Sequence, residues 1–341
     1  MNIPPPMRSS ANPSPVRRPA SIRRTTSIDV IWTEGPMGPR TMEGRARDII
    51  ARGADGGDDI IRAEASMTAQ ISNDRAITAI SADPAPAGLA KLVGERGGGH
   101  LRMVLREAVP QLIAEASPLY LLLDDISGTS LVSSWALSQW EADWLDRMIE
   151  LMPPEQLAKF QDREGVCWGF RPGSSALQDR SQMTDTPMAD GFELRNPADP
   201  GGWHAFPEHD GLSFRRARRI DVWREHDGSV GIEASFQDSA ARREGGRAAL
   251  HEYIVRASID PVTHCIDSLE PEPRVLPFGE CPGAIPNAKR LIGTPLPQIR
   301  ESVLDQLRGP QGCTHLNDAL RALAEVPKLL ESLDEALACP A

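Results

Sequence analysis

Apolar and polar residues alternate in two separated stretches of the chain, and each stretch predicts a set of strands. In the first half, residues 27–32 and 43–48 flank a glycine-containing turn, and residues 67–80 alternate around a second turn at residues 73–74. Alternation with a period of two is typical of strands that bury one face, and such turns join strands into hairpins. The first half therefore predicts about four antiparallel strands.

The second half repeats this pattern. Residues 219–223 and 233–238 flank a turn at Asp227-Gly228, and residues 253–269 alternate around residues 260–261. In both halves a proline-rich stretch follows, and segments with helical spacing come next. These segments are residues 87–93, 101–114 and 119–125 in the first half and residues 287–292, 299–308 and 313–320 in the second. We therefore predict an α+β fold of two tandem duplicated modules, each an antiparallel sheet of about four strands followed by about three helices.

Segments of different composition bound the two predicted modules. Residues 1–24 are rich in proline, serine and arginine and predict a disordered basic tail. The first module covers residues 25–128 and the second covers residues 215–341. Between them, residues 129–214 predict a helical and loop insert that carries five of the seven tryptophans. We expect the modules to pack with pseudo-twofold symmetry and to form a pocket at their interface.

Charge and composition narrow the class of partner. The net charge of −11 argues against nucleic acid as the main partner. No apolar run approaches the roughly 20 residues of a membrane-spanning helix, so no membrane partner is expected. Five cysteines, an odd number, and no signal peptide predict a cytoplasmic protein with reduced thiols. No glycine-rich phosphate loop follows a predicted strand, so no nucleotide cofactor is expected.

Residues 313–318, Cys-Thr-His-Leu-Asn-Asp, hold the most informative group of reactive side chains. A thiol, an imidazole and a carboxylate fall there within one predicted helical turn, at a helix N-terminus that favours an anion or a thiolate. A second cysteine, Cys281, precedes the helices of the same half. Because the first half has no cysteine or histidine at matching positions, we predict a single site near the second module.

Three kinds of site remain open for these residues. A metal site would use Cys281, Cys313 and His315 to hold zinc or iron, although their spacing is not that of a common zinc motif. A nucleophilic site would use Cys313 as a thiolate with His315 as its base. An acid–base site needs no covalent step and no cofactor. Its candidate residues are His315, Asp318, Asp238 and His251 from the second half and Tyr120 from the first.

Aromatic and basic side chains give a hint about the substrate. Trp140, Trp144 and Trp168 lie in the predicted insert, and tryptophan faces suit flat or apolar ligands. Ordinary core packing is the alternative for each of them. Arg216 belongs to a run of arginines before a predicted strand and would bind a carboxylate or phosphate, unless it lies on a solvated strand end. We expect a small apolar substrate with an aromatic ring.

Several short motifs carry a resemblance to a known family. They are residues 24–29, 44–48, 122–125, 251–253, 274–277 and 280–282, and the Gly-Cys-Thr-His-Leu motif at residues 312–316. Through them the chain resembles, over nearly its whole length beyond residue 20, an uncharacterised bacterial family known only as a domain of unknown function. The resemblance implies kinship, and occurrence in bacteria that degrade aromatic compounds, but no particular activity.

The second module also resembles the iron–sulfur scaffold proteins of the IscU type. This resemblance rests on hairpin strands followed by Cys281-Pro282-Gly283, a helix, and then Cys313-x-His315. The scaffolds have the order His-Cys, and Asp238 is nearest to the place of the cysteine in their first hairpin turn. The resemblance implies a role in iron–sulfur assembly or sulfur transfer.

The patterns together favour a cytoplasmic bacterial catabolic enzyme that acts on a small aromatic compound by cofactor-independent acid–base chemistry. The expected reaction is of the lyase type, either an elimination or a retro-aldol cleavage that releases an aldehyde. Two other functions stay open, namely a metal-binding or iron–sulfur scaffold protein and a non-catalytic ligand-binding protein. A homodimer is also left open.

Overall fold

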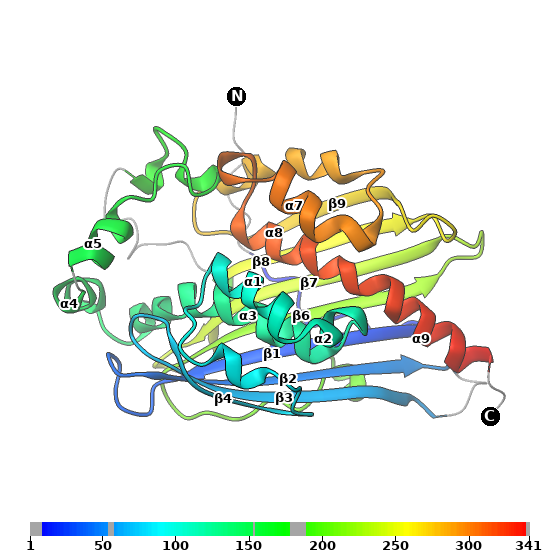
Figure 1. Ribbon diagram of the computed structural model, residues 1–341, viewed down its shortest axis with the longest axis horizontal. Helices are drawn as coiled ribbons and strands as arrows, with labels where there is room; N and C mark the ends of the chain where they lie inside the picture. The colour runs from blue at the N-terminus through cyan, green and yellow to red at the C-terminus, as the bar shows by residue number, and fades with distance from the viewer. Residues whose placement is uncertain (1–8, 54–57, 153, 178–188, 339–341) are drawn as a thin grey trace.

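The strands of both halves belong to one antiparallel sheet, which confirms the predicted α+β fold (Figure 1). The computed structural model describes residues 9–53, 58–152, 154–177 and 189–338. The strands are β1 (Ser21–Ile31), β2 (Arg40–Ala51), β3 (Ile60–Ile71), β4 (Ile77–Asp83), β5 (Ala189–Asp190), β6 (Ser213–Arg224), β7 (Val230–Ala241), β8 (Arg247–Ile259) and β9 (Ile266–Val275). Within the described residues their order is β4–β3–β2–β1–β6–β7–β8, and both β9 and the short β5 pair with β8.

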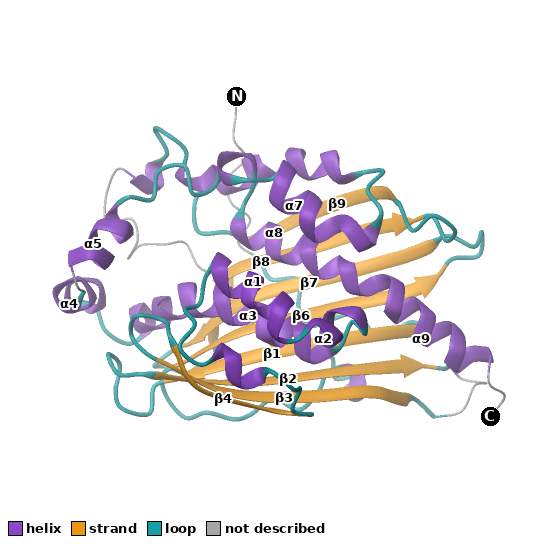
Figure 2. Cartoon of the chain, in the orientation of Figure 1, coloured by secondary structure: helices purple, strands orange, loops and turns teal. Residues whose placement is uncertain are grey.

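The helices of both halves cover the same face of this sheet (Figure 2). They are α1 (Gly99–Ala108), α2 (Pro110–Ala114) and α3 (Pro118–Val132) in the first half, and α7 (Ile299–Gln306), α8 (Thr314–Arg321) and α9 (Val326–Ala338) in the second. The insert contributes α4 (Trp144–Leu151) and α5 (Pro154–Gln161), which lie at one end of the molecule. Two large apolar clusters fill the space between helices and sheet, and their burial is the main stabilising contribution.

Strands β1 and β6 join the two halves. All eleven residues of β1 pair with β6, from Ser21 opposite Trp223 to Ile31 opposite Ser213. Each half thus contributes a meander of four strands, followed by helices, to a single sheet. The two predicted sets of strands therefore share one sheet, and their origin by duplication stays a prediction.

Some predicted helical segments are tighter or shorter than their spacing suggests. Of residues 87–93, only η1 (Leu89–Leu92) is helical, and residues 287–292 overlap η6 (Cys281–Leu291); both are 3-10 helices. The predicted segment 101–114 is divided between α1 and α2, because Pro110 has no N–H to continue the helix. Apolar spacing of three and four residues does not distinguish a short 3-10 turn from an α-helix.

The predicted basic tail takes part in the fold from residue 9 onwards. Residues 1–8 lie outside the described residues, but β1 begins at Ser21, inside the predicted tail. The segment before it crosses the sheet face opposite the helices, where the Ala11 N–H donates to Glu252 Oε1 at 2.5 Å. Arg17 Nη2 lies 2.6 Å from Asp199 Oδ1 and anchors the segment to the insert. A proline-rich composition predicts an extended chain but does not reveal the surface on which that chain lies.

The helices are short. In the described part of the chain, none is long and apolar enough to cross a membrane.

Candidate functional site

Each half of the sheet carries one buried arginine–aspartate pair at the same place. Arg24 is the fourth residue of β1 and lies opposite Asp48, the ninth residue of β2. Arg216 is the fourth residue of β6 and lies opposite Asp238, the ninth residue of β7. Each guanidinium donates two parallel hydrogen bonds to its carboxylate, and a β-bulge follows each aspartate. Such forked pairs fix both side chains, so they form a framework common to the two halves.

Two histidines are added to this framework in the second half. His251 on β8 lies opposite Asp238, whereas the residue on β3 opposite Asp48 is Ala63. His315 is the second residue of α8, which packs over β7 and β8. The side chains of Asp238, His251 and His315 therefore meet beneath α8, and the matching place in the first half has an alanine.

These three side chains form a compact group. His251 Nδ1 lies 3.2 Å from Asp238 Oδ2, and His315 Nε2 lies 3.9 Å from the same oxygen. The two imidazole rings are stacked, with centroids 3.5 Å apart and planes inclined by 18°. The side chain of His315 is 14% exposed, while that of Asp238 is fully buried. His315 is thus the member of the group that is most accessible from outside.

Burial and neighbouring charges set the protonation of the group. Burial lowers the pKa of His251, although the carboxylate of Asp238 opposes the shift. Burial also lowers the pKa of His315 well below its usual value, and the nearby His251, Arg216 and Arg218 add to this effect. Burial alone would raise the pKa of Asp238, but the charge of Arg216 and the hydrogen bonds from His251 and Arg216 outweigh it and lower that pKa. Two neutral imidazoles therefore face an ionised carboxylate at neutral pH.

A buried network of ion pairs surrounds the group and connects the two halves. Arg218 donates two hydrogen bonds of 2.6 Å to Asp125 on α3, and Arg102 on α1 lies 2.6 Å from Asp318 on α8. The positive members of the network are Arg102, Arg216, Arg218 and Arg321, and the negative members are Asp124, Asp125, Asp238 and Asp318. Four positive and four negative charges balance, so a proton on either histidine would lack a compensating charge.

The other predicted polar residues have different places. Arg216 is fully buried against Asp238, so it holds a carboxylate of the protein itself rather than an outside anion. Asp318 belongs to the network of ion pairs, 3.6 Å from Arg216 Nη1. The ring of Tyr120 lies beneath Arg300, at 4.7 Å from its Cζ to the ring centroid. Tyr120 also belongs to the apolar cluster of the first half, and none of its described contacts is with the histidines.

The predicted tryptophans pack at three separate places. Trp140 Nε1 donates to the backbone oxygen of Ala241 at 2.9 Å, and Trp144 is buried in a small apolar cluster. Trp168 lies against Gly283, where an added Cβ would be 2.1 Å from the indole nitrogen. The described residues therefore show no shared aromatic surface made by these three side chains.

The predicted thiols are buried and protonated. Cys313 directly precedes α8 and accepts a hydrogen bond of 3.5 Å from the Tyr253 hydroxyl. Burial raises the pKa of the Cys313 and Cys281 thiols, which does not favour a thiolate nucleophile. Cys281 lies beside Gly169, which Cys167 also approaches.

Within the described residues, Asp238, His251 and His315 form a group that could hold a metal ion. One donor atom from each lies within 4.8 Å of the donor atoms of the others. Two imidazoles and a carboxylate suit zinc or non-heme iron. The predicted set of Cys281, Cys313 and His315 does not form such a group among the described residues.

Sequence reasoning missed the role of Arg102, which lies between the carboxylates of Asp124 and Asp318. A signal was present in residues 119–125, where two aspartates follow directly after an apolar run. Charges that continue a buried helix face need partners, because an unpaired buried charge is costly. The arginine that supplies the partner cannot be identified without the fold.

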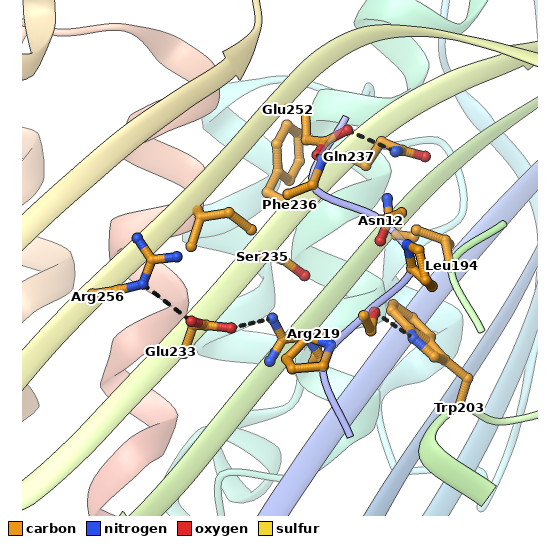
Figure 3. A pocket seen from close by; sticks show the side chains of 16 residues that line it. Asn12, Leu194, Trp203, Arg219, Glu233, Ser235, Phe236, Gln237, Glu252 and Arg256 are labelled. Carbon is orange, nitrogen blue, oxygen red and sulfur yellow. Dashed lines mark hydrogen bonds and ion pairs between the residues drawn. The ribbon is translucent and has the colours of Figure 1, made fainter. Parts of the chain in front are cut away.

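A cavity of about 240 Å³ lies on the other face of the sheet (Figure 3). Residues of β6, β7 and β8 form its floor, and residues 11–15, Leu194 and Trp203 form its roof. None of the predicted catalytic side chains lines it, because Asp238 and His251 point to the helices. The cavity and the Asp238–His251–His315 group are therefore separate candidate sites.

Fold and site together define an α+β protein with a buried group of one aspartate and two histidines. A family model described as "Protein of unknown function (DUF2889)" matches residues 214–328, which run from β6 into α9 and include this group. The predicted resemblance to a family of unknown function is thus confirmed over that range. No curated protein and no solved structure matches the chain. The resemblance to the IscU-type scaffolds stays a prediction.

Proposed function

We propose that this protein is an enzyme whose acid–base site is the group Asp238, His251 and His315. One observation carries the proposal. Both halves of the sheet have the same buried arginine–aspartate pair, but the histidines occur at the pair of the second half, and Ala63 stands opposite the aspartate of the first. The framework therefore does not require a histidine at that place, which favours a functional role for His251.

The geometry supports a defined division of roles. Asp238 accepts a hydrogen bond from His251 Nδ1, and this fixes the tautomer in which Nε2 carries the lone pair. A neutral imidazole with a free nitrogen acts as a general base. His315, stacked on His251 and more exposed, is placed to bind the substrate or to exchange a proton with it.

We propose a reaction of the lyase type. In a retro-aldol cleavage the base takes the proton of a substrate hydroxyl, a C–O double bond forms as the neighbouring C–C bond breaks, and the electron pair left on carbon takes up a proton. An elimination begins in the same way, with removal of a proton by the base. Neither reaction needs an oxidant or a reductant.

The surroundings of the site favour a neutral substrate with an apolar part. The ion-pair network is balanced in charge, so it offers no excess positive charge to an anion. The ring of Phe236 lies beside His315, with centroids 6.2 Å apart. It is fully buried with Arg216 and Arg218 over it, so it makes the surroundings of His315 apolar without offering a ring face to a substrate. The free thiols of Cys167, Cys265, Cys281 and Cys313 fit a cytoplasmic location, where thiols stay reduced.

The test is turnover of a panel of hydroxylated aromatic compounds, read as release of a small aldehyde or as loss of the substrate. We expect His251→Ala and His315→Ala to lower kcat/KM by about 100-fold or more, since general bases contribute factors of this size. His226→Ala changes an exposed histidine in a turn and should leave turnover unchanged. Full turnover by both site variants would contradict the proposal, and tight binding without turnover would favour a ligand-binding protein.

A metal centre is the second candidate, because the donor atoms of the same three residues lie within 4.8 Å of one another. We place it second because both oxygens of Asp238 already accept hydrogen bonds from Arg216, so an ion would share the carboxylate with a positive charge. Elemental analysis after incubation with zinc or iron(II) separates the candidates. About one ion per chain, lost in His251→Ala and His315→Ala but kept in Cys281→Ser, would favour the metal centre.

A further inference from the structure

The cavity of about 240 Å³ lies between the second half of the sheet and the segment that precedes β1 (Figure 3). Its floor consists of alternate residues of β6, β7 and β8, whose side chains point away from the helices. Gln237 and Glu252 on this floor are the sequence neighbours of Asp238 and His251. The cavity and the Asp238–His251–His315 group therefore lie back to back on the same two strands.

At one end of the floor the charged side chains are paired with one another. Glu233 accepts a hydrogen bond of 2.7 Å from Arg219 and one of 3.1 Å from Arg256. Arg219 also donates to Asp221, and Arg256 donates to Glu272. An ionic ligand would have to compete with these pairs, so the floor favours a neutral molecule.

Hydrogen-bonding capacity outside these ion pairs remains on the floor. Ser235 is partly exposed to the cavity, and its hydroxyl has no partner within the described part of the chain. On the same face of the sheet, Glu252 lies opposite Gln237 and accepts hydrogen bonds from the Ala11 N–H and from Gln237 Nε2, at 2.5 and 2.8 Å. A carboxylate holds further lone pairs, so Glu252 can also accept from a ligand hydroxyl.

The roof of the cavity is largely apolar, although Asn12 and Ser14 also belong to it. Pro13, Pro15, Leu194 and the ring of Trp203 contribute to it. Trp203 Nε1 donates to Ser14 Oγ at 3.0 Å, so the polar end of the indole is satisfied away from a ligand. A largely apolar roof above a floor of hydrogen-bonding groups matches a molecule with a flat apolar face and a hydroxylated edge.

We propose that this cavity is a binding site for a small neutral molecule with one hydroxylated ring, distinct from the Asp238–His251–His315 site. The volume agrees with this size, since a closed apolar cavity of about 150 Å³ already admits benzene. The ligand ring would pack beneath Trp203 and the prolines, and its hydroxyl would donate to Glu252 and accept from Ser235.

Titration with phenol, followed by ligand-observed NMR on the full chain, tests the proposal. We expect saturable binding of phenol and binding of benzoate that is at least tenfold weaker, because the anion meets the paired carboxylates. Ala217→Leu places a larger side chain among the lining residues and should weaken phenol binding at least tenfold. Ser235→Ala removes one hydrogen bond, which corresponds to about a fivefold loss. Ser66→Ala, on an exposed position of β3, should bind as the wild type does.

Each outcome bears on the proposal. Absence of phenol binding, benzoate binding as tight as phenol binding, or unchanged phenol affinity in folded Ala217→Leu and Ser235→Ala would overturn it. If Ala217→Leu does not fold, Ser235→Val replaces it, since valine suits a strand and removes the hydroxyl. The His251→Ala variant should still bind phenol here, which separates this site from the proposed acid–base site.

Discussion

The protonation of a single buried residue, His204, affects the stability of this protein. It is buried against the sheet face opposite the helices. There its two ring nitrogens lie 2.9 and 2.8 Å from the hydroxyls of Thr25 and Ser27. Burial, together with the charges of nearby arginines, lowers the pKa of His204 to about 3. The imidazole is therefore neutral in the folded protein across the physiological range of pH.

Because the pKa of His204 is lower in the folded chain than in the unfolded chain, the stability of the protein depends on pH. The unfolded chain binds a proton at His204 below about pH 6.5, and the folded chain does so only near pH 3. The stabilisation is therefore complete above pH 6.5 and is lost as the pH falls from 6.5 towards 3. Between pH 7 and pH 5 we expect the wild type to lose about 2 kcal/mol more unfolding free energy than His204→Gln, measured with urea. Equal losses in both proteins would contradict this, and His226→Gln should behave as the wild type does.

At the residue scale, the sequence named His251, His315 and Asp238 among its acid–base candidates, and the structure brings these three side chains together. The unequal decoration of the two halves pointed to Cys281, Cys313 and His315, of which only His315 belongs to this group. Arg216 was predicted to bind a ligand because its cross-strand partner cannot be seen in the sequence. The thiols were predicted to be reactive because their burial cannot be seen in the sequence either. In the folded chain, burial raises the pKa of Cys313.

At the scale of elements, close contact between α3 and the sheet depends on one glycine. A Cβ at Gly128 would lie 2.0 Å from Arg216 Nη1 and 3.0 Å from Asp318 Oδ2. The absence of a side chain lets α3 approach the ion-pair network and brings Asp125 within reach of Arg218. The helix thus gives up some intrinsic stability for this approach.

Gly128→Ala tests this view of the helix. Alanine favours the helix by about 1 kcal/mol, but the clash with Arg216 should cost more, as overpacking in a core does. We expect a net loss of about 1–2 kcal/mol of unfolding free energy in urea. Gly99→Ala, at the first residue of α1 with no atom within 4 Å of the added Cβ, is the matched control and should not destabilise. A Gly128→Ala protein as stable as this control would contradict the account.

The strands were predictable as elements because their alternation is clear. The break at Pro110 was missed, since residues 101–114 were predicted as one helical segment. The 3-10 helices were not predictable, because their spacing overlaps with that of an α-helix. Strand β1 was predicted too short, from residue 27 onwards. Its first residues, Ser21 to Thr26, are polar apart from Ile22, yet all are buried. Arg23 and Arg24 can be buried because they pair with Asp221 and Asp48 on opposite sides of the sheet.

At the scale of the whole molecule, the seam between β1 and β6 holds the halves together. Two ion pairs reinforce it symmetrically on the sheet face opposite the helices. Arg23 Nε lies 2.6 Å from Asp221 Oδ1, and Arg215 Nε lies 2.7 Å from Asp29 Oδ1. The sequence indicated two similar halves but not this junction, because the pairing of two strand edges leaves no periodic pattern in either strand. A strand that loses its partner exposes a row of N–H and C=O groups.

The seam predicts the behaviour of the isolated second half. A chain that begins at residue 205 would expose the whole edge of β6, which β1 covers in the intact protein. We expect it to dimerise or aggregate through that edge, as measured by size-exclusion chromatography with light scattering. The full chain, run in parallel, should not associate in this way. A stable monomer with cooperative unfolding would show that the second half does not need the first.

The central claim is that the Arg216–Asp238 pair takes part in the proposed acid–base site, whereas the Arg24–Asp48 pair only stabilises the fold. Asp48→Asn and Asp238→Asn make the same change at matching positions, and each should cost about 3–5 kcal/mol of unfolding free energy. The most direct test is their turnover of a substrate from the panel, per folded molecule and at low temperature. The account predicts wild-type turnover for Asp48→Asn and a loss of about 100-fold for Asp238→Asn. Equal turnover by the two variants would contradict it.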